Sequence, residues 1–231
     1  MRRAFVAVGV LAWLAAPPIS RGADQPAANP APQLVAALLQ AIRQPAADQF
    51  PSPESVVKFL LEQIQRQDLD EAAKAFPIVE TYQRLDLASS ARYLLIIEPN
   101  STPFPQSPFR NLGRAMQPLG YFDSISLGLL GVDLTRVTTL KDRGSDAELK
   151  PIIDKCDRSR LANLQLGAIT AKLPQPVKPD DARGTALHIS ARTQVEASLT
   201  APDGKPAQLM CVVEKIDTNW RIVHCELQAS P

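Results

Sequence analysis

The chain has no surplus of charge of either sign. Its 231 residues include 25 Lys and Arg against 24 Asp and Glu, a formal net charge of +1. Proteins that bind nucleic acid use an excess of basic side chains to neutralise phosphates, and no run of Lys or Arg occurs along this sequence. The composition therefore predicts that nucleic acid is not a partner.

Long apolar runs are also scarce, and the one that stands out lies at the N-terminus. Residues 4–16 are apolar, follow Arg2 and Arg3, and lead to small residues near Gly22. The run is too short to span a bilayer, and this order of basic, apolar and small residues is typical of a signal peptide. We predict that residues 1–22 are a cleavable signal peptide; an uncleaved membrane anchor is the alternative.

The remainder of the sequence has no second long apolar run, and no cysteine follows the leader to carry a lipid anchor. Removing three arginines with the leader leaves 22 basic against 24 acidic side chains. We therefore expect a soluble protein that is secreted or periplasmic, with no membrane span after leader removal.

Motifs for metal, nucleotide and nucleophile chemistry are missing as well. The two His and three Cys show neither C-x-x-C nor H-E-x-x-H spacing, so a zinc site is not expected. G-x-S-x-G, P-loop and dinucleotide-binding glycine patterns do not occur. These absences predict no metal and no cofactor.

What is present begins with a helical N-terminal half. A Pro- and Ala-rich linker over 23–33 is expected to be disordered, and an extra amphipathic helix is expected within 34–50. A single α+β domain is expected over 52–231. Its opening helix has Ser52 as N-cap and Pro53 as first residue, both favoured at a helix start.

The middle of the chain gives a weaker pattern. A second helix is expected after Asp68 or Asp70, and a third runs to the Glu98-Pro99 pair. The segment Ser124–Gly144 is rich in β-branched residues and glycine, which favours extended structure over helix.

The C-terminal third changes to a period of two. Apolar and polar side chains alternate from Leu187 to Leu199, as in a half-buried strand, and the length of this run predicts a bend or bulge. The fold class predicted is α+β, with N-terminal helices packed on a curved, mainly antiparallel C-terminal sheet. The other expected elements of this sheet are strands within 161–171, 208–216 and 220–228, and a turn at 201–205.

Two stretches carry a resemblance to a known group of proteins. They are "SPESVVKFLLEQIQRQDLDEAAKAF" (52–76) and "VEASLTAPDGKPAQLMCVVEKIDTNWRI" (195–222). Together they resemble the opening helix pair and the closing strands of the ketosteroid-isomerase/nuclear-transport-factor-like superfamily, in particular its small secreted members. The resemblance implies a cone-shaped cavity between helices and sheet. Some members are enzymes and many bind ligands or partners, so fold alone does not give function.

Proton-transfer chemistry would need an ionisable group inside such a cavity. His188, Arg192 and Glu196 are spaced four apart on one face of the long strand, and could act as base, anion clamp and acid if that face lined the cavity. The favoured alternative places them on the solvated face, because the opposite face is consistently apolar. Asp123 and Asp133 are further carboxylates near apolar runs.

Four aromatic side chains are candidates for ligand binding, although core packing is the favoured role for each. They are Tyr82, Tyr93, Tyr121 and Trp220.

The cysteines of the last hairpin can be paired by counting from its loop. A three-residue loop, Asp217 to Asn219, places Cys211 opposite Cys225, whereas a two-residue loop places Cys211 opposite His224. Because export exposes thiols to an oxidising environment, we predict a Cys211–Cys225 disulfide. Two buried free thiols are the alternative, and Cys156 is the odd cysteine or a competitor for either partner.

The sequence predicts, from these patterns, an exported, non-enzymatic binding or accessory protein of the cell envelope. The predicted occupant of its cone is a small apolar ligand or an envelope protein. A cofactor-free isomerase or lyase and a structural interaction module with a filled core are the alternatives.

Overall fold

The computed structural model of the protein describes residues 31–85, 108–178 and 180–229. The predicted signal peptide, most of the predicted linker and Tyr93 lie outside these residues. No helix in the described ranges combines the length and apolar character that crossing a membrane requires.

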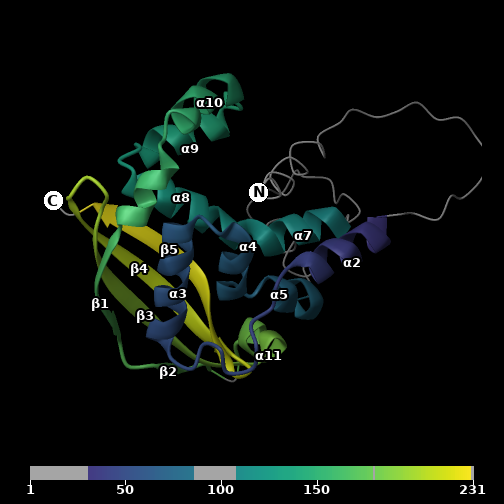
Figure 1. Ribbon diagram of the computed structural model, residues 1–231. Helices are drawn as coiled ribbons and strands as arrows, with labels where there is room; N and C mark the ends of the chain where they lie inside the picture. Colours follow the sequence, from purple (N-terminus) through teal and green to yellow (C-terminus); the bar gives the residue numbers. More distant parts are fainter. Residues whose placement is uncertain (1–30, 86–107, 179, 230–231) are drawn as a thin grey trace, which may run out of the picture.

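Helices occupy the first part of the described chain and strands the last part, which confirms the predicted α+β class (Figure 1). The helices are α2 (Ala31–Ala41), α3 (Pro53–Arg66), α4 (Leu69–Ala72), α5 (Ile78–Arg84), α7 (Pro108–Met116), α8 (Gly120–Leu129), α9 (Leu134–Asp142), α10 (Asp146–Asp154) and α11 (Ala182–Leu187). Short 3₁₀ turns occur at Ala73–Ala75, Gln117–Leu119 and Arg158–Asn163. The strands are β1 (Gln165–Ala171), β2 (Gln175–Pro176), β3 (Ile189–Thr200), β4 (Pro206–Ile216) and β5 (Asn219–Ala229).

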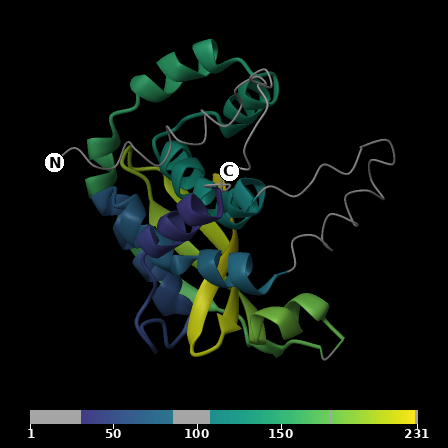
Figure 2. The ribbon, with the colours of Figure 1, turned by 90° about the vertical axis from the view of Figure 1, so that its right-hand side faces the viewer.

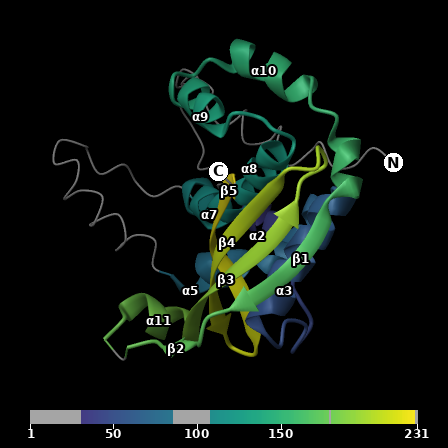
Figure 3. The same cartoon turned by 90° about the vertical axis from the view of Figure 1, so that its left-hand side faces the viewer.

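The strands form one antiparallel sheet in the order β1-β3-β4-β5, and β2 pairs with the start of β3. Helix α3 crosses one face of this sheet, and α11 is the one described helix that lies at the other face, at one end of it (Figure 3). Apolar residues of β3 and β4 alternate toward α3, as the period of two predicts. The predicted arrangement of helices on a curved antiparallel sheet is therefore confirmed.

Helix α3 begins where the sequence predicts. Ser52 is the N-cap, and its hydroxyl accepts a hydrogen bond from the backbone N–H of Ser55. The chain leaves the helix through Gln67 in the left-handed conformation, and Asp68 then caps α4 by accepting from the N–H of Glu71. This predicted helix pair is confirmed. The predicted helix within 34–50 is displaced, since α2 begins at Ala31 and ends at Ala41. The prediction of disorder is therefore wrong for residues 31–33, which form the first turn of α2.

The prediction of extended structure over Ser124–Gly144 is wrong, because this segment forms most of α8 and all of α9. Phe122, Ile125 and Leu129 are spaced three and four apart and are all buried in the main core. That packing of one helical face outweighs the weak intrinsic preference of β-branched residues for strands.

The long strand starts later than the alternation predicts. Asp181 caps a short helix by accepting from the N–H of Gly184 at 2.9 Å, so α11 takes up the residues before His188. His188 ends this helix with a φ of 56° and is not part of β3. The predicted irregularity is confirmed, since the register of β3 against β4 shifts between Ile189 and Ala191.

The last hairpin has a two-residue loop, not the three-residue loop that was expected. Ile216 pairs with Asn219, and Asp217 takes the positive φ of 52° that tight hairpin loops require. A bulge at Val223 then adds one residue to β5, so Cys211 pairs with Cys225 after all. The register that sets Cys211 opposite Cys225 is therefore as predicted, although the loop from which it was predicted is wrong. The predicted disulfide itself is not formed in the structure, and it stays a prediction.

Candidate functional site

The space between the helices and the sheet is filled. The side chains there are at most 5% exposed. They come from α3, from the residue that follows the 3₁₀ turn after α4, and from the three long strands: Leu60, Leu61, Ile64, Phe76, Val195, Leu209 and Trp220. In the described part of the chain, a ligand site between α3 and the sheet would therefore require these side chains to move.

An open cleft lies instead at one end of the sheet, with a volume of about 540 Å³. Its walls come from the connection between α8 and α9 and from the β3–β4 turn, and they are mainly apolar. The apolar lining residues are Leu129, Val132, Leu134, Ala201, Ala207 and Leu227. This volume is within the range of sites that hold small molecules.

Two glycines shape this cleft. A Cβ atom on Gly128 would lie 2.6 Å from Cδ2 of Leu227, so the missing side chain lets the end of α8 approach β5 closely. Gly131 has a φ of 79°, a conformation that L-residues rarely adopt, and it turns the chain from α8 toward α9. Without these two glycines, the apolar walls of the cleft would not meet in this way.

The charged side chains of the cleft are Asp133, Asp203 and Lys205. Asp203 and Lys205 form an ion pair at 3.0 Å, and hydrogen bonds from Lys205 lower the pKa of Asp203. Asp133 precedes α9 and accepts from the N–H groups of Thr135 and Arg136 at 3.0 and 3.2 Å. The rim is thus polar while the walls are apolar.

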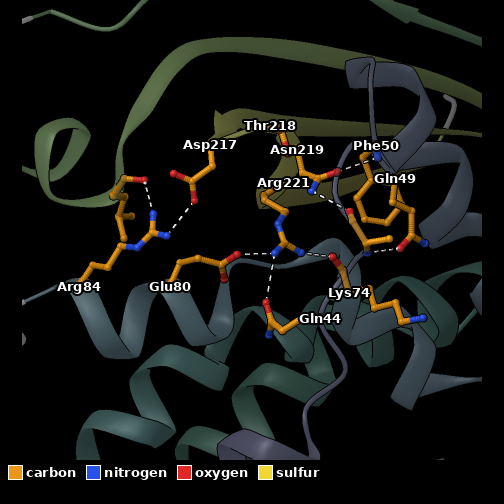
Figure 4. A network of polar contacts seen from close by, with 12 residues as sticks. Gln44, Gln49, Phe50, Lys74, Glu80, Arg84, Asp217, Thr218, Asn219 and Arg221 are labelled. Atoms are coloured by element: carbon orange, nitrogen blue, oxygen red, sulfur yellow. Dashed lines mark hydrogen bonds and ion pairs between the residues drawn. The ribbon is translucent and has the colours of Figure 1, made fainter.

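A buried polar network occupies the opposite end of the sheet (Figure 4). The guanidinium of Arg221, which is 3% exposed, forms an ion pair with Glu80 and donates to the carbonyl of Lys74 and to Oε1 of Gln44. Burial lowers the pKa of Arg221, while the negative charge of the Glu80 carboxylate acts to raise it. These contacts join β5 to α5 and to the residues after α2.

The loop between β4 and β5 contacts the segment that connects α2 to α3. Asn219 accepts from the N–H of Phe50 at 2.8 Å and donates to the carbonyl of Ala46 at 3.0 Å. Thr218 accepts from the N–H of Asp48 at 3.4 Å. The network fixes the segment between α2 and α3 on the hairpin, so it is best explained as structural.

Arg192 belongs to a second charge cluster, which surrounds the buried carboxylate of Glu214. It donates to Glu214, which is 1% exposed, and Arg183 of α11 donates to both oxygens of that carboxylate at 2.7 Å. Asp181 lies 3.5 Å from Arg192. The cluster holds α11 against the face of the sheet that is turned away from α3. Arg192, the candidate anion clamp, is therefore engaged with Glu214.

The three candidate catalytic residues contact different partners. His188 lies 3.2 Å from Asp217, and Glu196 lies 3.4 Å from Lys172. His188, Arg192 and Glu196 have side chains that are 66%, 45% and 37% exposed. The structure therefore does not bring them together around a cavity. It places Arg192 and Glu196 on the face turned away from α3, as the favoured alternative predicted.

The two further carboxylates have different surroundings. Asp123 forms an ion pair with Arg158 at 3.0 Å, and only Asp133 borders the open cleft. The described residues contain no group of His, Cys, Asp and Glu side chains suited to a metal ion.

The aromatic candidates lie mainly in the core. Trp220 is 5% exposed, and Tyr82 packs against the main core. The hydroxyl of Tyr121 lies 2.9 Å from Nδ1 of His224, and burial raises the pKa of this tyrosine. Neither Trp220 nor Tyr121 lines the cleft.

The sulfur atoms of Cys211 and Cys225 lie 2.7 Å apart in the core, and in this structure no disulfide joins them. Burial raises the pKa of the Cys225 thiol well above its ordinary value. Cys156 lies after α10 and donates to the carbonyl of Ile152 at 3.2 Å.

Comparisons of the chain with protein-family models, curated proteins and solved structures found no match. The resemblance to the ketosteroid-isomerase/nuclear-transport-factor-like superfamily therefore stays a prediction.

Sequence reasoning named Asp133 but missed the cleft beside it. The sequence gives little local indication of the cleft. Its walls come from two short segments that lie far apart in the sequence, "LLGVDL" and "APDGKPA".

Proposed function

We propose that the protein is an exported, non-enzymatic binding protein that holds a small apolar ligand in the cleft between the α8–α9 connection and the β3–β4 turn. The observation that carries this proposal is the cleft itself, about 540 Å³ with mainly apolar walls. Apolar walls with a few polar groups at the rim are the usual features of a small-molecule site.

The surroundings of the ionisable groups favour binding over catalysis. His188, Arg192 and Glu196 are at least one-third exposed and are engaged with Asp217, Glu214 and Lys172 respectively. A general base works best in a dry site within reach of the substrate proton. A cofactor-free isomerase or lyase is therefore the less favoured proposal.

Export to the cell envelope is the second part of the proposal. It rests on the leader-like order of residues 1–22, with two arginines before an apolar run. In that environment, Cys211 and Cys225 are proposed to form a disulfide. Two thiols become one S–S bond, and two electrons and two protons pass to a disulfide donor of the envelope. The support is their directly opposed register on neighbouring strands.

A structural interaction module is the other candidate function. The observation that favours it is the hairpin of α9 and α10, which has a small core of its own and extends from the end of the sheet (Figures 1 and 2). That core contains Val137, Leu140 and Leu149. A module of this kind would bind a protein partner and leave the cleft empty.

A matched pair of substitutions tests the cleft proposal. Leu134→Trp fills the cleft, and Leu173→Trp makes the same change at a side chain that is 89% exposed and lies outside the cleft. Binding of decyl maltoside, below its micelle concentration, is measured by titration calorimetry. We expect binding to the wild type and to Leu173→Trp and none to Leu134→Trp, with all three proteins folded by circular dichroism. Equal binding to the two variants would rule out the cleft as the site.

A further inference from the structure

We infer that the ligand of this cleft is an amphiphilic cation, with an apolar body and one positively charged group that sits beside Asp133. This inference rests on the proposed function, because it assigns a chemical class to the ligand of the same cleft. It comes from the charges around the rim and from the two helix ends that meet there.

The side chains of the rim carry one uncompensated negative charge. Asp203 and Lys205 neutralise each other through their ion pair at 3.0 Å. Asp133 has no ion-pair partner among the residues that the structure describes. Both of its backbone hydrogen bonds, from Thr135 and Arg136, go to the same oxygen, Oδ1. The other oxygen, Oδ2, is therefore left to accept from a ligand.

The helix ends at the cleft do not remove this negative charge. Gly128 and Leu129, which close α8, line the cleft, and the last turn of α8 contains no basic residue. Helix α9 begins on the other side of the same connection at Leu134. The partial negative charge at the end of α8 offsets the partial positive charge at the start of α9. What remains is the carboxylate of Asp133.

The rest of the cleft suits an apolar body. Its walls are formed by aliphatic side chains such as Val132, Ala207 and Leu227. An apolar chain buried against these walls loses contact with water, which is favourable. A positive group at its end meets Asp133 at the rim, where water still reaches both charges. A negative group would meet the same carboxylate and be repelled.

Three probes with the same ten-carbon chain test the inference. They are decyltrimethylammonium, decyl maltoside and decyl sulfate, each titrated below its micelle concentration at low salt and neutral pH. We expect the cation to bind at least about fivefold more tightly than the maltoside, the factor that one solvent-exposed contact between unit charges provides. The sulfate should bind most weakly.

Two matched substitutions identify the charge responsible. Asp133→Asn removes the carboxylate and keeps a residue that caps a helix equally well. Asp142→Asn makes the same change at the exposed far end of α9. The preference for the cation should disappear in Asp133→Asn and persist in Asp142→Asn. A preference that persists in Asp133→Asn would overturn the inference.

The remaining outcomes separate this inference from the proposed function. If the maltoside or the sulfate binds as tightly as the cation, the ligand class is wrong and the cleft remains a binding site. If no probe binds, or if binding survives Leu134→Trp, the proposed function fails as well.

Discussion

Cys211 of β4 lies directly opposite Cys225 of β5, and their sulfur atoms are 2.7 Å apart inside the core. This pairing depends on the bulge at Val223, which moves β5 by one residue against β4. Without the bulge, the two-residue loop would place His224 opposite Cys211. The bulge therefore decides which side chain faces the thiol of Cys211.

The first prediction concerns this pair. Protein purified from its own compartment without reductant should show one thiol accessible after denaturation, that of Cys156, and three after reduction. The bond should stabilise the fold by about 3 kcal/mol, the value for a closed loop of roughly 15 residues. Cys156→Ser should then show no free thiol before reduction. Three free thiols in the unreduced wild type would contradict the proposed disulfide.

The second prediction concerns the buried ion pair of Arg221 and Glu80. Arg221→Met should lower the free energy of unfolding by about 3–5 kcal/mol, because it leaves the Glu80 carboxylate buried without a cation. Chemical denaturation measures this change. The double variant with Glu80→Met should recover much of the loss, since no unpaired charge remains.

An exposed ion pair provides the control for this prediction. Lys150 and Asp154 have side chains that are 74% and 57% exposed. Lys150→Met should change the free energy of unfolding by less than about 1 kcal/mol. A loss as small as this for Arg221→Met would show that the network does not hold the N-terminal segment on the hairpin.

The third prediction is a pH dependence that comes from Asp217. Its pKa is lowered first by the hydrogen bond from Arg84 and then by the hydrogen bond from His188. A carboxyl group with a lowered pKa in the folded state stabilises the protein above the ordinary aspartate pKa of about 4, and this contribution disappears as the pH falls through the folded value. Asp217→Asn should therefore be less stable than the wild type at neutral pH.

Unfolding measured between neutral and acidic pH checks this dependence. The difference between wild type and Asp217→Asn should shrink as the pH falls below the ordinary aspartate range. It should remain modest, because the Asp217 side chain is 44% exposed and water screens the interaction. A difference that does not vary with pH would contradict the assigned cause.

The fourth prediction concerns the attachment of α11 to the sheet. Glu214→Gln weakens the contacts with Arg183 and Arg192, so amide hydrogens of α11 should exchange faster with solvent. Hydrogen exchange followed by mass spectrometry measures this. Glu226→Gln is the control, because that residue lies on an exposed part of β5. Unchanged protection of α11 in Glu214→Gln would show that the cluster does not hold the helix.

Local signals predicted those elements whose ends are set by nearby residues. The start of α3 follows from the hydroxyl of Ser52 and the fixed φ of Pro53, and both effects are local. The alternation in β3 and β4 follows from burial of one face of the sheet. For the same reason, the solvent-facing positions of Arg192 and Glu196 could be predicted.

Elements that depend on distant contacts could not be predicted in this way. Helix α8 forms because Phe122 and Ile125 pack into a core that α3 and the strands of the C-terminal third make together, both far from α8 in the sequence. The cleft needs Gly128 to meet Leu227, and these residues are far apart in the sequence. The bulge at Val223 likewise has no local sequence signal.

Native mass spectrometry of the protein purified from its own compartment tests the central claim most directly. The account predicts a retained small molecule on the wild type that is missing from Leu134→Trp and present on Leu173→Trp. A wild-type protein that carries no small molecule, or a retained molecule that Leu134→Trp also keeps, would contradict the claim that this cleft holds a ligand.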